Sequence, residues 1–134
     1  GSDASLQRSV RRFPHWSALT FLSLGMQTSS VRSYRMDDFN YDETQRVDQV
    51  MGACFLIRRT LLDAIGTLDE NYFIWFEEVD FCKRAKNAGW RVVYTPIAQA
   101  VDYKGQSFKQ VSRLKKRKWY LNSLFHYFRK HGLS

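Results

Sequence analysis

The stretch from Glu77 to Gly89, EEVDFCKRAKNAG, restricts the fold of this chain more than any other segment. Its acidic residues fall in the first turn and its basic residues lie toward the other end, an order that complements the helix dipole at both ends. Gly89 is typical of the position that closes a helix. The pattern predicts a helix over residues 77–89.

An aromatic run directly precedes this expected helix. Its members are Tyr72, Phe73, Trp75 and Phe76. Aromatic residues that lead into an acidic turn can form a half-apolar pocket with carboxylates at its rim, where a carboxylate can act as a general base. Trp75 and Phe76 are therefore candidates for stacking on an acceptor sugar, although aromatic residues in such a run belong to a core more often than to a ligand site.

The three carboxylates of the first turn allow two interpretations. Glu77 and Asp80 are three residues apart and share a helix face, whereas Glu78 points about 100° away. All three could accept hydrogen bonds from free amides at the helix N-terminus, which would contribute about 0.3–1 kcal/mol each. Alternatively, one of them faces a pocket while the others cap the helix and pair with Lys or Arg.

The remaining segments predict a mixed α/β fragment, with a few-stranded mixed sheet and flanking helices. We expect strands at residues 4–13, 46–59, 90–96 and 98–104, and helices at residues 16–25, 60–66 and 107–130. Gly52 interrupts an apolar strand pattern and indicates a bulge or a close backbone approach. Thr60 is the expected cap of its helix, and residues 26–45 lack periodicity, which predicts a long mobile loop.

The positive charge of the chain gathers at its end. The chain has 134 residues and a net charge of +8, yet from Tyr103 onward nine Lys or Arg residues occur without one acidic residue. The expected helix at 107–130 has an apolar stripe made of Leu114, Leu121, Leu124, Phe125 and Phe128. It also has a basic turn with an adjoining aromatic residue, made of Lys115, Lys116, Arg117, Lys118 and Trp119.

Two interpretations of this helix stay open. It could be a surface helix that packs on the domain through its stripe. It could also lie on an anionic membrane, with its basic face toward the headgroups and its aromatic residues at the interface. Nucleic acid would fit the charge as well, but the sequence contains no recognisable nucleic-acid-binding module.

Cysteine and histidine residues give no metal signal. Cys54 and Cys82 are far apart and lack metal-ligand spacing, so we expect two buried free thiols in a reducing compartment. His126 and His131 are five residues apart on the basic helix, and we expect a solvated face rather than a metal site. The chain has no apolar run of roughly 18 residues and no signal peptide, which favours a cytoplasmic location. Residues 1–2 are typical of an expression tag, so we expect a piece of a longer protein.

A series of short motifs is spread along most of the chain, each at one position. They are Gly52-Ala53-Cys54, Arg58-Arg59, Gly66, Leu68-Asp69-Glu70, Phe76-Glu77-Glu78-Val79-Asp80-Phe81-Cys82, Arg84, Gly89, Pro96 and Gly105-Gln106-Ser107. Together they resemble the C-terminal half of family 2 inverting glycosyltransferases, particularly the bacterial rhamnosyltransferase-like branch. The segments LQRSVRRFP and YFRKHG also resemble this branch.

This resemblance implies a GT-A fold, of which residues 3–106 would form the acceptor side and residues 107–134 a basic amphipathic helix. In the family, an N-terminal half binds the nucleotide-sugar through an Asp-x-Asp motif and a divalent metal, Mg²⁺ or Mn²⁺. A carboxylate of the C-terminal half deprotonates the acceptor hydroxyl, and the displacement inverts the anomeric carbon. Glu78 occupies the position of that base, with Glu77 and Asp80 as supporting carboxylates.

The chain departs from the family pattern at two positions. Glu78 stands where the family has Asp, and Asp102 stands where it often has a His near the metal and the diphosphate. Arg58 and Arg59 could contact the diphosphate or could simply begin the next helix. No Asp-x-Asp precedes the matching segment; MDDF at residues 36–39 is not that motif.

These observations lead to one main hypothesis and one alternative. The main hypothesis is a glycosyltransferase fragment at the inner face of the plasma membrane, whose parent transfers a sugar to a glycan or a lipid-linked acceptor. We expect the fragment alone to be inactive and to bind no metal. We also expect a homodimer, because a missing half would uncover a sheet edge. The alternative is a non-catalytic module that binds a membrane or another polyanion on a degenerate glycosyltransferase fold.

Overall fold

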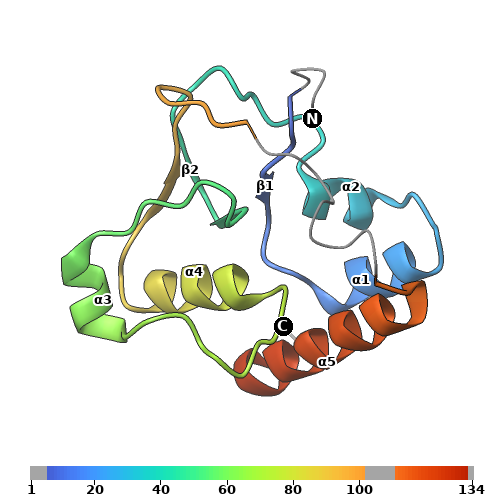
Figure 1. Cartoon of the computed structure of the whole chain (residues 1–134). Helices are drawn as coiled ribbons and strands as arrows, with labels where there is room; N and C mark the ends of the chain where they lie inside the picture. The colour runs from blue at the N-terminus through green and yellow to red at the C-terminus, as the bar shows by residue number, and fades with distance from the viewer. Residues whose placement is uncertain (1–5, 102–110, 133–134) are drawn as a thin grey trace.

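The computed structural model describes residues 6–101 and 111–132, which form a mixed α and β structure (Figure 1). Its elements in chain order are β1 (Val10–Arg11), α1 (Trp16–Ser23), α2 (Ser29–Arg35), β2 (Gln45–Val47), β3 (Gln49–Val50), α3 (Arg59–Ile65), α4 (Glu77–Asn87), β4 (Val92–Tyr94) and α5 (Arg113–His131). The helix predicted at residues 77–89 is confirmed as α4, and Gly89 follows it with φ of 83°. The helix predicted at residues 16–25 and the strand at 90–96 are also confirmed, as α1 and β4.

The strands form two separate antiparallel pairs rather than one mixed sheet. β1 pairs with β3 through Val10 and Val50, and β2 pairs with β4 through Val47 and Val92. The single strand predicted at 46–59 is wrong, because Asp48 separates two short strands that pair with different partners. The Asp48 carboxylate accepts hydrogen bonds from the Phe13 amide at 3.3 Å and from Lys86 Nζ at 2.7 Å.

The apolar run after β3 also differs from the prediction. Residues 51–58 form no strand, and Leu56 is 99% exposed. The apolar composition of this run suggested a buried strand, but no described strand pairs with it, although the Met51 amide donates a hydrogen bond to the Ser9 carbonyl oxygen at 2.8 Å. The expected strand at 98–104 is not formed over residues 98–101, and its remainder lies outside the described residues. Cys54, on the same run, is exposed, so only the burial of Cys82 is confirmed.

The segment predicted as a loop contains a helix. In α2 the side chain of Thr28 accepts a hydrogen bond from the Val31 amide, and Val31 and Tyr34 face the core. These two buried residues are three positions apart, as one helix face requires. The loop prediction was wrong here because two apolar residues among polar ones are too few to show a period.

The longest helix, α5, packs along the other elements (Figure 1). It begins at Arg113, later than the predicted position 107, and Ser112 caps it by accepting from the Lys115 amide at 3.3 Å. Gly132 follows its end, as expected. The core joins four helices and the aromatic run through Ala18, Leu19, Tyr34, Tyr72, Phe76, Val79, Tyr127 and Phe128.

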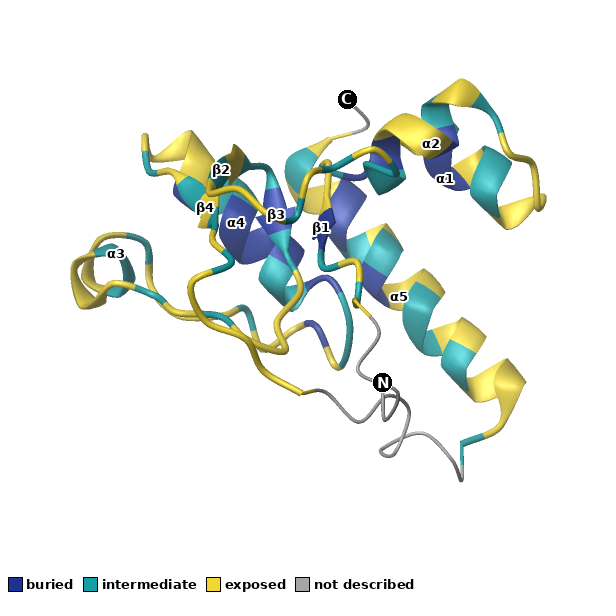
Figure 2. Ribbon diagram, turned by 90° about the horizontal axis from the view of Figure 1, so that it is seen from above, coloured by how far each residue is buried: buried dark blue, intermediate teal, exposed yellow. Residues whose placement is uncertain are grey.

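Helix α3 stands at the edge of the molecule, and none of its residues is buried (Figure 2). Its N-cap is Arg58, with no side-chain capping bond, so the expectation of a Thr60 cap was wrong. Gly66 closes α3 with φ of 80°, as predicted. By contrast, α4 buries one side against its neighbours (Figure 2), so α4 is the element that can hold a side chain in a fixed, desolvated position.

Candidate functional site

The entry into α4 is a strained turn. Trp75 and Phe76 both have left-handed backbones, with φ of 61° and 70°. For residues with bulky side chains this conformation costs on the order of 1–3 kcal/mol each, and such turns cluster at functional sites. Because the turn leads directly into Glu77, it sets the direction in which the first carboxylates of α4 point.

Helix α5 holds this turn in place. Ser123 Oγ donates a hydrogen bond to the Ile74 carbonyl oxygen at 2.7 Å. The ring of Phe76 lies 5.5 Å from that of Tyr120 and 5.7 Å from that of Tyr127, between centroids. The aromatic run thus packs on α5, and Phe76 lies in the core. Trp75 is half-buried, with its ring 6.2 Å from Tyr120.

Glu78 lies in the first turn of α4, the helix that packs against β3. A Cβ placed on Gly52 would lie 3.8 Å from Glu78 Cβ, so the backbone at Gly52 passes close to this side chain. The close approach that Gly52 indicated in the sequence is therefore present. Oε2 of Glu78 is buried and has no hydrogen-bond partner among the described residues.

The surroundings of Glu78 raise its pKa above the ordinary value of 4.5. Burial is the main cause, because a desolvated carboxylate is disfavoured, and the nearby charge of Glu77 acts in the same direction. The amides of Glu78 and Gly52 and the charge of Arg11 oppose the rise without cancelling it. A carboxylate with a raised pKa and an unoccupied oxygen can accept a proton from a hydroxyl group.

Asp80 has a different environment from that of Glu78. Its side chain is fully buried, and it accepts from Arg84 Nε at 2.8 Å, Lys130 Nζ at 2.9 Å and His131 Nε2 at 2.7 Å. Burial raises the pKa of Asp80, but the three hydrogen bonds outweigh burial and hold the pKa below its usual value. Asp80 therefore stays ionised and joins α4 to the end of α5.

A second carboxylate extends this network. Lys130 Nζ also donates to Asp69 Oδ2 at 2.7 Å, and His126 Nε2 lies 3.4 Å from the same oxygen. The hydrogen bond from Lys130 holds the pKa of Asp69 well below its usual range. The predicted solvated face for the two histidines was wrong, since the side chain of His131 is only 8% exposed and both histidines contact carboxylates.

The other candidate residues lie apart from Glu78. Arg58 and Arg59 are exposed at α3, where Arg59 Nε pairs with Asp63 at 2.9 Å. Asp102 lies outside the described residues. On α5, Lys115, Arg117 and Lys118 are exposed, while Lys116 and Trp119 are half-buried. Trp119 lies 4.9 Å from Phe73 between ring centroids, and Lys115 Nζ lies 5.5 Å from its ring.

The described residues offer no metal centre. Across residues 6–101 and 111–132, no group of three or more His, Cys, Asp or Glu side chains is placed to hold a metal ion. Glu77 and Glu78 alone would supply too few ligands for a divalent cation. In the same residues, no helix combines the length and the hydropathy needed to cross a bilayer.

Comparison with known proteins identifies the family of the chain. The profile described as "Glycosyltransferase like family 2" matches residues 2–122, so the chain belongs to this family. It is 36% identical over 75 residues to the N-acetylglucosaminyl-diphospho-decaprenol L-rhamnosyltransferase of Mycobacterium tuberculosis, a match covering 56% of this chain and 24% of that protein. It is 30% identical over 120 residues to rhamnosyltransferase WbbL of Escherichia coli, covering 89% and 43%.

A third relative matches a shorter part of the chain. The low-salt glycan biosynthesis hexosyltransferase Agl10 of Haloferax volcanii is 31% identical over 55 residues, covering 41% of this chain and 18% of that protein. No solved structure matches the chain at a significant level. The chain thus spans less than half the length of each of these three relatives.

Three residues that hold the site were missed in the sequence. Ser123, Lys130 and His131 attach α5 to the turn and to Asp80. The available signal for a carboxylate contact was the spacing of His126 and Lys130, which are four residues apart on one helix face. Such a pair can bind the same carboxylate. The identity of that carboxylate depends on the tertiary fold.

Proposed function

We propose that this chain is the acceptor-side part of a longer inverting glycosyltransferase with a GT-A fold, and that Glu78 is its general base. The longer enzyme would transfer a sugar from a nucleotide-sugar to a glycan or a lipid-linked acceptor. The observation that carries the proposal is the state of Glu78, whose buried oxygen lacks a partner and whose pKa is raised. Membership of the family and the rhamnosyltransferase relatives support the reaction class.

The proposed chemistry follows from this arrangement. Glu78 accepts the proton of an acceptor hydroxyl while the acceptor oxygen forms a bond to the anomeric carbon. The bond from that carbon to the diphosphate breaks on the opposite face, and the nucleoside diphosphate leaves with the electron pair. A base contributes about 10²–10⁴-fold to such a step. In the longer enzyme a divalent metal would neutralise the leaving diphosphate, and Asp102, Arg58 and Arg59 are candidates for its vicinity.

The two neighbouring carboxylates have separate proposed roles. Asp80 accepts hydrogen bonds from the cations Arg84 and Lys130 and from the imidazole of His131 and keeps its negative charge, so it is a structural anchor for α4. Glu77 has a buried oxygen without a partner among the described residues, and its charge raises the pKa of Glu78. Trp75 can reach an acceptor sugar more readily than Phe76, because Phe76 is committed to the core.

The test uses the longer enzyme and four substitutions. Glu78→Gln keeps the shape but cannot accept the proton, so kcat should fall about 10²–10⁴-fold with little change in donor affinity. Glu78→Asp restores the usual family residue and should retain activity. Initial rates against acceptor concentration are compared with those of Glu77→Gln and Asp80→Asn. If Glu78→Gln works normally and Glu77→Gln is inactive, the base is Glu77; if all four are active, these residues only stabilise the helix.

We also propose that α5 binds an anionic membrane, which would bring the site to a lipid-linked acceptor. Leu114, Leu121 and Phe125 are exposed on this helix beside its cations. An apolar pocket of about 600 Å³ lies between α1 and α5 and includes Trp16 and Phe125. The name of the Mycobacterium tuberculosis relative contains a diphospho-decaprenol, which is a lipid-linked diphosphate.

Co-sedimentation with lipid vesicles tests this surface. Vesicles of phosphatidylcholine with phosphatidylglycerol should bind the chain, and neutral vesicles should bind it less. Replacing Lys115 and Lys118 with Gln should weaken binding, since each basic residue near such a surface contributes about 1 kcal/mol. If binding is equal for both vesicle types and both proteins, α5 is only a packing helix. If vesicles bind while Glu78 proves dispensable, the non-catalytic module is the better description.

A further inference from the structure

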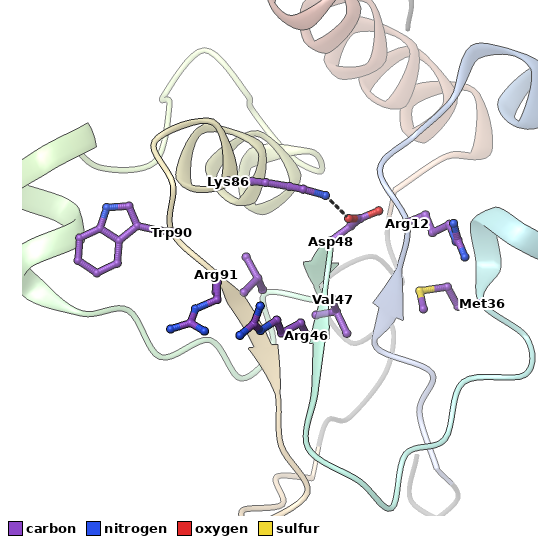
Figure 3. Close-up of a pocket in the computed structure, with 9 residues that line it drawn as sticks. Arg12, Met36, Arg46, Val47, Asp48, Lys86, Trp90 and Arg91 are labelled. Atoms are coloured by element: carbon purple, nitrogen blue, oxygen red, sulfur yellow. Dashed lines mark hydrogen bonds and ion pairs between the residues drawn. The ribbon is translucent and has the colours of Figure 1, made fainter.

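A second hollow lies at the far end of α4 from Glu78 (Figure 3). It has a volume of about 440 Å³ and is lined by Arg12, Met36, Arg46, Val47, Asp48, Lys86, Trp90, Arg91 and Val92. Along α4, Glu78 and Lys86 are eight residues apart, which corresponds to about 12 Å of helix rise. This basic pocket is therefore separate from the candidate catalytic carboxylate.

Four cations line the basic pocket, and they come from four different parts of the chain. Arg12 precedes α1, Arg46 lies on β2, Lys86 lies near the end of α4, and Arg91 precedes β4. Arg46 pairs with Val93 across the β2–β4 ladder, and side chains alternate along a strand. Arg91, two residues before Val93, therefore lies on the same side of the ladder as Arg46.

The cations of the basic pocket are only partly neutralised. Asp48 is its one carboxylate, and it pairs with Lys86 at 2.7 Å. Among the described residues, no carboxylate lies within ion-pair distance of Arg12, Arg46 or Arg91. Like charges gathered around one hollow repel each other unless an anion enters.

Two features favour anion binding in the pocket: the backbone of Arg12 is fixed, and backbone amides occupy the carbonyl oxygens at the end of α4. Gln49 is buried and its Nε2 donates to the Arg12 carbonyl oxygen at 2.7 Å, which fixes the backbone of Arg12. The negative end of α4 would repel an anion. However, the carbonyl oxygens of Arg84, Ala85 and Lys86 accept hydrogen bonds from the amides of residues 88, 90 and 89, which occupies these acceptors within the chain.

We propose that the basic pocket binds a phosphate-bearing ligand, with Arg46 and Arg91 as its main contacts. A guanidinium group offers a planar fork that matches two phosphate oxygens, and three of the four cations are arginines. The volume of about 440 Å³ is larger than one phosphate group needs, so a diphosphate fits the pocket better. The diphosphate could be free in solution or could belong to a lipid headgroup; the pocket chemistry is the same.

Inorganic pyrophosphate is the first probe. Isothermal titration calorimetry with the 134-residue chain should show saturable binding that weakens with added salt, because the pocket is open to solvent. Replacing Arg46 and Arg91 with Gln should weaken binding at least about tenfold, since each removes a charge-assisted hydrogen bond. The matched control replaces Arg32 and Arg113, two exposed arginines outside the pocket, and should change the affinity less than about twofold.

The outcomes decide the proposal. Absence of saturable binding overturns it, and so does an equal loss in the pocket and control variants, because that would indicate diffuse charge attraction. Arg12→Gln gives a second pocket variant should the double variant fail to fold, as judged by circular dichroism. Vesicles containing a polyprenyl diphosphate then identify the source of the diphosphate. If the pocket substitutions weaken vesicle binding more than the control, the phosphate belongs to a lipid; if only pyrophosphate binding changes, it is a soluble ligand.

Discussion

Replacing Asp80 with Asn should destabilise the chain far more than a surface substitution of the same kind. The Asp80 side chain is fully buried and accepts hydrogen bonds from three donors, the cations Arg84 and Lys130 and the imidazole of His131. Asn carries no charge and places an NH₂ group where one of these donors now points. The substitution therefore removes the buried counter-charge of Arg84 and Lys130, and breaking a buried ion pair typically costs about 3–5 kcal/mol.

The expected loss lies near the lower end of that range. Arg84 keeps two further acceptors, the carbonyl oxygens of Ile65 at 2.8 Å and Thr67 at 2.7 Å. Lys130 keeps Asp69 at 2.7 Å. These contacts compensate part of the lost interaction, so we expect about 3 kcal/mol. This exceeds the contribution of a simple helix cap, which is about 0.5–2 kcal/mol.

The chain provides a matched control for this substitution. Asp63 accepts from Arg59 Nε at 2.9 Å with the same four-residue spacing as Asp80 and Arg84, but the two side chains are 59% and 85% exposed. Exposed pairs of this kind contribute about 0–1 kcal/mol. Urea denaturation followed by circular dichroism gives the free energy of unfolding of both variants. If Asp80→Asn costs no more than Asp63→Asn, the buried network does not anchor α4.

Three further predictions concern the site and the assembly of the chain. Because burial raises the pKa of Glu78, the folded state binds this proton more tightly than the unfolded state, so the stability due to this group falls as pH rises above about 4.5. Glu78→Gln should therefore raise the urea midpoint at pH 7, and this gain should disappear below pH 4. Equal midpoints of the two proteins at pH 7 would contradict this prediction. The 134-residue chain should show no transferase activity, because a base alone supplies only about 10²–10⁴-fold, and turnover of any nucleotide-sugar would refute the expectation. Leu56, Ile97 and Leu114 are 99%, 89% and 81% exposed, so light scattering should detect dimers or exchanged segments; a monomer at high concentration would count against this.

The sequence predicted those elements whose signals are local. The charged residues at the two ends of α4 act within one or two helical turns, and so do the glycines after α3 and α5. The structure confirms the helices that these signals predicted. The strand prediction for the apolar run at residues 51–58 was wrong, because a run of apolar residues indicates burial without identifying the segment that it packs against. Family resemblance was enough to choose Glu78 as the candidate base. Its desolvation and its proximity to Gly52 depend on tertiary contacts, so they could be seen only in the structure.

The structure changes the interpretation of the aromatic run before α4, because this run packs on α5. In the sequence it suggested a pocket wall, but most of its rings contact α5: Tyr72 lies 4.7 Å from His126, and Phe73 lies 4.9 Å from Trp119. A strained turn persists only when its surroundings enforce it. Helix α5 therefore has a role in positioning Glu78, in addition to any role at a membrane.

Ser123→Ala tests this positioning role. Ser123 is buried, and its hydroxyl donates to the Ile74 carbonyl oxygen at 2.7 Å, next to the left-handed residues. Its removal leaves the carbonyl oxygen of the half-buried Ile74 without this donor, which costs about 1–3 kcal/mol. The turn can then relax, Glu78 becomes more accessible to water, and its pKa should fall toward the ordinary value.

Carboxyl NMR titration of Glu78 separates positioning from stability alone. The matched control is Ser23→Ala, which removes a hydroxyl that donates to the Thr20 carbonyl oxygen at 2.7 Å at the exposed end of α1. We expect the control to leave the Glu78 pKa unchanged, because the hydrogen bond of Ser23 lies within α1. If Ser123→Ala lowers the stability but leaves the Glu78 pKa where it was, the hydrogen bond supports the fold without directing the carboxylate. In that case the burial of Glu78 depends on Gly52, whose backbone passes close to this side chain, and on the packing of α4 against β3.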